Sequence, residues 1–179
     1  MPPAIVAPLP VLAWCATQPR WLTAVGDTLV WTTGEADEPG GLFAIRASDL
    51  GRAAPRCLLD FAPWRDAGVV CPVGLAVHAG RASLIIGDEV VQVPLDGNAP
   101  TTLRRPWDSA MLWSIGTCRG ELFVSTYDTV QRELRSLSPV RWGIERVHDG
   151  RFERTHESIQ PGDRPSVGDI VATAGGAGA

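Results

Sequence analysis

Short apolar runs alternate with turn residues along most of the chain. None of these runs keeps the period of an α-helix over about ten residues, so the pattern predicts an all-β protein. Paired turn residues between the runs, such as Gly26-Asp27 and Asp149-Gly150, supply the positive φ that tight antiparallel hairpins need. The pattern predicts strands at 20–25, 28–33, 41–46, 56–61, 73–79, 82–86, 89–94, 101–105, 112–117, 121–126, 132–137, 141–147 and 151–156.

Three blocks of these strands resemble one another. Each block has two strands joined by a glycine-containing turn and then a third strand, which in the last block is placed at 133–137. The leucines taken as equivalent, Leu29, Leu84 and Leu122, are 55 and 38 residues apart. These spacings bracket the roughly 40–50 residues of a four-stranded propeller blade. The sequence therefore predicts a partial β-propeller of about three four-stranded antiparallel blades, with a β-sandwich as the alternative.

The predicted repeat domain covers residues 19–156. Residues 1–18 are an N-terminal extension with a possible closing strand, and residues 157–179 are predicted to be a disordered tail. The N-terminus is apolar, but it lacks a basic leader and is broken by prolines, so no signal peptide is predicted. No apolar run reaches the roughly 18 residues of a membrane span. We therefore expect a soluble, cytoplasmic protein, with export left open.

Charge and composition exclude several classes. The net charge is −4 without a basic stripe, so neither nucleic acid nor a membrane is an expected partner. All 16 cationic side chains are arginine, which excludes lysine Schiff-base chemistry and a phosphate loop ending in Gly-Lys-Ser/Thr. The four cysteines form no Cys-x-x-Cys pair and are predicted to be buried free thiols, with a Cys57–Cys71 disulfide as the alternative after export. No cofactor and no metal site are predicted.

The second block, from Pro72 to Leu103, resembles the short β-propeller repeats of the NHL and YWTD type. In the first block, Trp31 and Thr32 match the second strand of the YWTD repeat. The resemblance covers roughly residues 12–137. It implies a fold of four-stranded antiparallel blades around a central axis. It implies no single activity, because the relatives include lactonases, protein-binding scaffolds and receptors.

The number of blades predicts a partner. Propellers close with four or more blades, whereas this chain holds about three. An open arc exposes apolar surface on its terminal blades. We therefore expect self-association, or another chain that completes the propeller.

Two similar segments before the second and third blocks are the candidate ligand-binding sites. Each has a Pro-Trp pair followed by an acid, and the candidate residues are Trp64, Asp66, Trp107 and Asp108. An indole face beside a carboxylate can stack on a sugar or another small molecule and accept its hydrogen bonds. The alternative is structural, with the tryptophans wedged between blades and the acids capping turns.

The enzyme hypothesis has less support. A propeller lactonase holds a divalent metal with Glu, Asn and Asp side chains, but Asn98 is the only asparagine in the chain. No Gly-x-Ser-x-Gly motif occurs, and no catalytic residue is predicted. The acidic segment Glu35 to Glu38 is interpreted as a solvated loop, and the alternating Arg and Glu residues of 132–154 as an exposed, charge-balanced face. The predicted function is a non-catalytic binding or interaction module; the alternative is a metal-dependent hydrolase.

Overall fold

The computed structural model describes residues 19–34, 40–68, 72–105, 110–129 and 140–160. Within these ranges the chain is nearly all strand. The strands are β1 (Pro19–Val25), β2 (Thr28–Thr33), β3 (Gly41–Arg46), β4 (Arg56–Asp60), β5 (Val73–His78), β6 (Arg81–Ile86), β7 (Glu89–Pro94), β8 (Thr101–Arg104), β9 (Ala110–Cys118), β10 (Glu121–Thr129), β11 (Val140–His148) and β12 (Arg151–Gln160). A 3-10 turn, η1 (Ala47–Asp49), and a short helix, α1 (Ala62–Asp66), complete the described elements.

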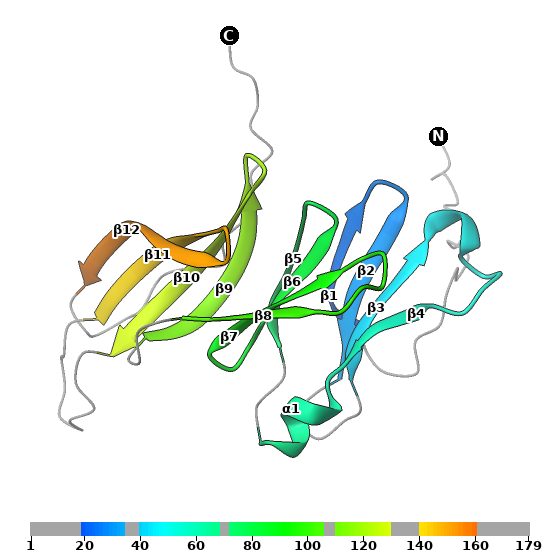
Figure 1. Cartoon of the computed structure of the whole chain (residues 1–179), viewed down its shortest axis with the longest axis horizontal. Coiled ribbons are helices and arrows are strands. Elements are labelled where there is room, and N and C mark those ends of the chain that lie inside the picture. Colours follow the sequence, from blue (N-terminus) through cyan, green and yellow to red (C-terminus); the bar gives the residue numbers. More distant parts are fainter. Residues whose placement is uncertain (1–18, 35–39, 69–71, 106–109, 130–139, 161–179) are drawn as a thin grey trace, which may run out of the picture.

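The strands form three four-stranded antiparallel sheets, each built from four consecutive strands. We name them sheet A (β1–β4), sheet B (β5–β8) and sheet C (β9–β12). Figure 1 shows them side by side, with sheet B in the middle. The predicted all-β fold of three four-stranded sheets is confirmed. The strand predicted at 132–137 and the segment 1–18 lie outside the described residues, as do residues 161–179 of the predicted tail. Residues 157–160, which were predicted to belong to that tail, form the end of β12.

Sheet C corrects the strand assignment of the third block. Its third strand is β11, which pairs with β10 through partners such as Leu122 and Val147, and β12 is its fourth strand. The prediction that 133–137 supplies the third strand is wrong. Loop length is only weakly constrained by the energetics of the fold, so spacing alone could not show which apolar run pairs with β10.

Equivalent hairpins open the three sheets. Each joins the first two strands through a two-residue loop, closed by Val25 and Thr28, His78 and Arg81, or Cys118 and Glu121. In sheets B and C both loop residues have positive φ, as type I′ turns require. Counted from these loops, Leu29 and Leu122 are equivalent to Ala82. The predicted equivalence with Leu84 was wrong by two residues.

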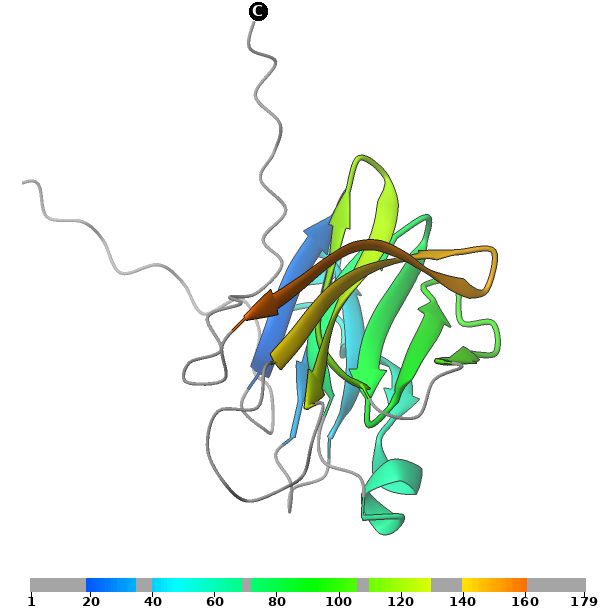
Figure 2. The same ribbon diagram turned by 90° about the vertical axis from the view of Figure 1, so that its left-hand side faces the viewer.

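Sheet B is covered on both faces. Leu84 and Val91 pack against Val30 and Leu42 of sheet A, whereas Ile85 of the same strand packs with residues of sheet C. Successive strand residues point to opposite faces, so a strand such as β6, buried at every position after Arg81, needs a layer on each side. Figure 2 shows the three sheets layered in this way.

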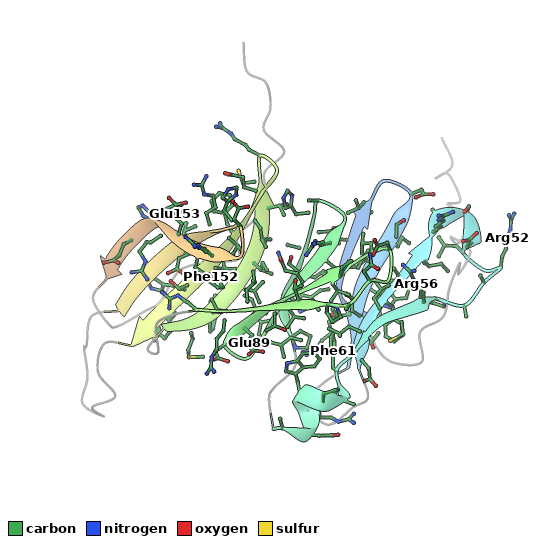
Figure 3. The ribbon with its side chains drawn as sticks, in the orientation of Figure 1. Arg52, Arg56, Phe61, Glu89, Phe152 and Glu153 are labelled. Carbon is green, nitrogen blue, oxygen red and sulfur yellow. The ribbon has the colours of Figure 1, made fainter. Side chains whose placement is uncertain are left out.

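Helix α1 lies in the connection from sheet A to sheet B, where the sequence predicted a loop. Proline is accepted in the first turn of a helix because the missing N–H has no partner there, and Pro63 occupies this position. Phe61, just before the helix, is buried in the core between sheets A and B (Figure 3). The connection is thus fixed to both sheets.

Candidate functional site

The structure places two of the four predicted ligand-binding residues. Trp64 on α1 is partly buried and packs against the core between sheets A and B. Asp66 is exposed, and its carboxylate lies 3.6 Å from the guanidinium of Arg65. Trp107 and Asp108 lie outside the described residues, so the structure does not bring the two pairs together. The packing of Trp64 agrees with the structural alternative, and its ligand-binding role stays a prediction.

Of the residues considered as metal ligands, Asn98 makes hydrogen bonds within a turn, and the acidic ones lie outside the described residues. Asn98 donates from its side-chain amide to Asp96 at 2.8 Å and from its backbone N–H at 3.0 Å, which closes the β7–β8 turn. Glu35, Asp37 and Glu38 lie outside the described residues. Among the residues that are described, no three His, Cys, Asp or Glu side chains are grouped so as to hold a metal ion.

An exposed apolar surface follows the first strands of the three sheets. Every large hydrophobic side chain that is exposed in the described part of the chain lies on β1, β5 or β9. We call these residues the first-strand surface: Trp21, Leu22, Val25, Val73, Met111 and Trp113. The three strands are neighbours, since β1 contacts β5 and β5 contacts β9. The first-strand surface therefore includes residues of all three sheets.

The face of sheet C that is turned away from sheet B carries an aromatic cluster. Leu122 and Val124 point toward sheet B, so the alternate residues of β10 point away. Tyr127 lies 4.7 Å from Trp142 between ring centroids, and Trp113 packs beside both at 6.3 and 6.4 Å. We call this the outward face of sheet C: Met111, Trp113, Phe123, Tyr127, Trp142 and Ile144.

Sheet A has a corresponding outward face. Val30 and Leu42 point toward sheet B, so their sequence neighbours Trp31 and Phe43 point away. Their rings stack with centroids 6.0 Å apart. Cross-strand partners on the same face complete the outward face of sheet A: Leu22, Leu29, Trp31, Phe43 and Ile45.

Unpaired polar atoms occur on these two faces. Among the described side chains, three buried polar atoms have no hydrogen-bond partner: Trp31 Nε1, Ser125 Oγ and Trp142 Nε1. The first belongs to the outward face of sheet A, and the other two lie on the outward side of sheet C. A buried polar atom without a partner costs about 1–3 kcal/mol. Among the described residues of sheet B, no buried side-chain polar atom lacks a hydrogen-bond partner.

A buried ion cluster joins sheet B to sheet C. Glu145 on β11 is 0% exposed, and Arg105, which follows β8, has a side chain that is 3% exposed. Arg105 donates two hydrogen bonds to the carboxylate, at 2.8 and 2.6 Å. Arg154 on β12 donates two more hydrogen bonds to the carboxylate, at 2.9 and 3.3 Å. The interpretation of this segment as a wholly exposed charged face is wrong at Glu145, although Arg146 does form partly exposed ion pairs with Glu121 and Glu153.

Two opposing effects set the pKa of Glu145. Burial raises it, but the hydrogen bonds and positive charges of Arg105 and Arg154 outweigh burial, so the pKa lies below the ordinary value. The ionised carboxylate therefore stabilises the fold above its unfolded-state pKa of about 4.3, and this contribution is lost as the pH falls through the folded-state pKa.

This pKa predicts an acid-dependent difference between the wild type and Glu145→Gln. From about pH 7 to pH 5, the difference in their free energies of unfolding should stay constant. Below about pH 4 it should shrink, because a protonated glutamate resembles glutamine in charge. Urea unfolding at a series of pH values measures the difference, and a gap that stays constant or widens on acidification would contradict the assignment.

A crevice of about 420 Å³ opens between sheets A and B. Arg46, Asp49 and Asp96 lie along its wall, and Arg56 donates across it to the backbone oxygens of Leu95 and Asp96. Figure 3 shows Arg56 beside the β7–β8 hairpin. Since Arg56 directs these hydrogen bonds to the hairpin, it fastens the two sheets together.

The described cysteines differ from the prediction. Cys57 and Cys118 are free thiols, as predicted, but both are exposed. Cys57 lies on the last strand of sheet A, and Cys118 lies beside the β9–β10 hairpin, so neither reaches a core. Cys15 and Cys71 lie outside the described residues.

Sequence reasoning missed the features that stand out in the structure. Along β2 and β9–β11, the aromatic residues of the outward faces alternate with residues that face sheet B. This two-residue period could have indicated from the sequence which residues share the outward face. The Arg105–Glu145 contact spans 40 residues and left no local signal.

Comparisons with known proteins return nothing: no family model, no curated protein and no solved structure matches this chain. None of the described helices is long and apolar enough to cross a membrane.

Proposed function

We propose that the protein is a non-catalytic binding module of the β-propeller type, which docks another polypeptide through the first-strand surface. The propeller interpretation is supported by three successive four-stranded sheets that pack face on face, with their first strands in contact. Such an arrangement is compatible with blade-like repeats.

The observation that carries the proposal is the placement of the exposed hydrophobic residues. Leu22 is 66% exposed, Met111 58% and Trp113 45%. Leaving such side chains in water is unfavourable, and large apolar side chains exposed on neighbouring strands are typical of interaction surfaces. Tryptophan and methionine are also enriched at the centres of protein interfaces.

Site-specific photo-cross-linking tests the proposal. A photoreactive amino acid replaces Trp113 in the full chain, and the same amino acid replaces Arg119 as a control at the exposed β9–β10 turn. We expect discrete polypeptide adducts from position 113 and none from position 119.

Two results would overturn the proposal. One is equal labelling from positions 113 and 119, or no adduct from either position. The other is a purified protein that binds a divalent metal stoichiometrically and loses an esterase activity together with that metal, which would instead establish the hydrolase.

A further inference from the structure

The chain repeats one packing step twice. Counted from the equivalent hairpins, Val30 of sheet A corresponds to Ser83 of sheet B, and Thr32 corresponds to Ile85. Val30 faces sheet B, and Ile85 faces sheet C. Each sheet therefore covers the next one with the same side, which we call its leading face, and meets the previous one with its trailing face.

The two terminal sheets leave one face of each kind without a neighbouring sheet from the described chain. The outward face of sheet C is a leading face, because Phe123 corresponds to Val30. The outward face of sheet A is a trailing face, because Trp31 corresponds to Leu84, which packs against sheet A. A leading face and a trailing face are the two halves of the contact that this chain already forms between A and B and between B and C.

The chemistry of the two faces suits such a contact. Each presents aromatic and aliphatic side chains, and each includes an exposed first-strand residue, Leu22 on sheet A and Met111 on sheet C. The nearest charge on the sheet C side, Arg146, is neutralised by Glu121 and Glu153 at 2.8 and 2.5 Å. Docking against this face therefore buries apolar area without leaving a charge unpaired.

We infer that the docked polypeptide is a second copy of this chain, with the outward face of its sheet A packed on the outward face of sheet C. The inference rests on the proposed function and names its partner. In a two-fold symmetric pair this contact forms twice, which uses all four outward faces and leaves no open end. The second copy would cover the side chains of these faces that are exposed, such as Leu22 and Met111, whereas the indole N–H groups of Trp31 and Trp142 are already buried in the single chain.

Light scattering on the purified full chain tests the inference. We expect a particle of twice the chain mass of 19.1 kDa. Leu22→Asp damages only the sheet A face and Met111→Lys only the sheet C face, and both positions are exposed enough for the fold to tolerate them. Each variant alone should raise the dissociation constant more than about tenfold, because both contacts then bury an unpaired charge.

Mixing the two variants distinguishes this contact from other dimers. A pair of one Leu22→Asp chain and one Met111→Lys chain has one undamaged contact. Its second contact buries both introduced charges, which are of opposite sign, so a particle of twice the chain mass should return. Thr102→Lys, on the exposed last strand of central sheet B and outside the first-strand surface, is the matched control and should leave the pair intact.

Four outcomes would overturn the inference: a wild type that stays at 19.1 kDa at high concentration, an assembly of more than two chains, variants that fail to complement, or dissociation by Thr102→Lys. These failures are separable from failure of the proposed function. A monomer that still gives specific adducts at Trp113 binds a different polypeptide, whereas a monomer without adducts contradicts both proposals.

Discussion

Replacing Glu145 by glutamine is expected to lower the free energy of unfolding by about 3–5 kcal/mol at neutral pH, the usual loss when one partner of a buried ion pair is removed. The variant keeps the size of the side chain but removes the negative charge shared by Arg105 and Arg154. For a chain of this length the melting temperature should fall by roughly 6–20 °C. Urea unfolding and calorimetry measure both quantities.

Two controls separate the buried cluster from charge changes in general. Glu153→Gln removes a carboxylate that is 61% exposed and also paired with arginine, and should lower the free energy of unfolding far less than Glu145→Gln, because water screens an exposed ion pair. The double variant Glu145→Leu, Arg105→Met replaces the buried pair with apolar groups and should recover most of the loss. A loss below about 1 kcal/mol for Glu145→Gln would show that the cluster does not hold sheets B and C together.

The sequence predicted the elements well because they depend on local signals. Two-residue hairpins, alternating burial and turn glycines are each encoded within a few neighbouring residues, and the strands 28–33, 41–46 and 89–94 end where predicted. Pairing across long loops is a different problem. Nothing local distinguishes 133–137 from 140–148 as the partner of β10, since both segments interleave apolar residues with polar or charged ones.

The candidate site was harder to predict for the same reason. Glu145 occupies the position that Val91 has in sheet B, counted from the hairpins, so the repeat pattern alone predicts an apolar residue there. Its charge is tolerated only because Arg105, 40 residues earlier, reaches it in three dimensions. The exposure of hydrophobic residues on the first strands likewise depends on how the sheets stack. The pattern of a single strand holds no information about that stacking.

Replacing Gly74 by alanine is expected to cost about 2–5 kcal/mol, the sum of backbone strain and steric overlap. Gly74 lies at the irregularity of β5 with φ +75°, where an L side chain is strained by about 1–2 kcal/mol. A Cβ atom there would also lie 2.9 Å from Cγ2 of Ile115 on β9. Relieving that overlap requires the two first strands to move apart, at a further cost of about 1–3 kcal/mol.

Gly80→Ala is the matched control for this prediction, because Gly80 has nearly the same φ, +72°, but nothing within 4 Å of the added methyl group. It should show the effect of backbone strain alone, so its urea midpoint should lie between those of the wild type and Gly74→Ala. Adding Ile115→Ala removes the overlapping methyl group, and the extra cost of Gly74→Ala should then largely disappear in a double-mutant cycle. If Gly74→Ala and Gly80→Ala lowered the free energy of unfolding equally, the close approach of β5 to Ile115 on β9 would be contradicted.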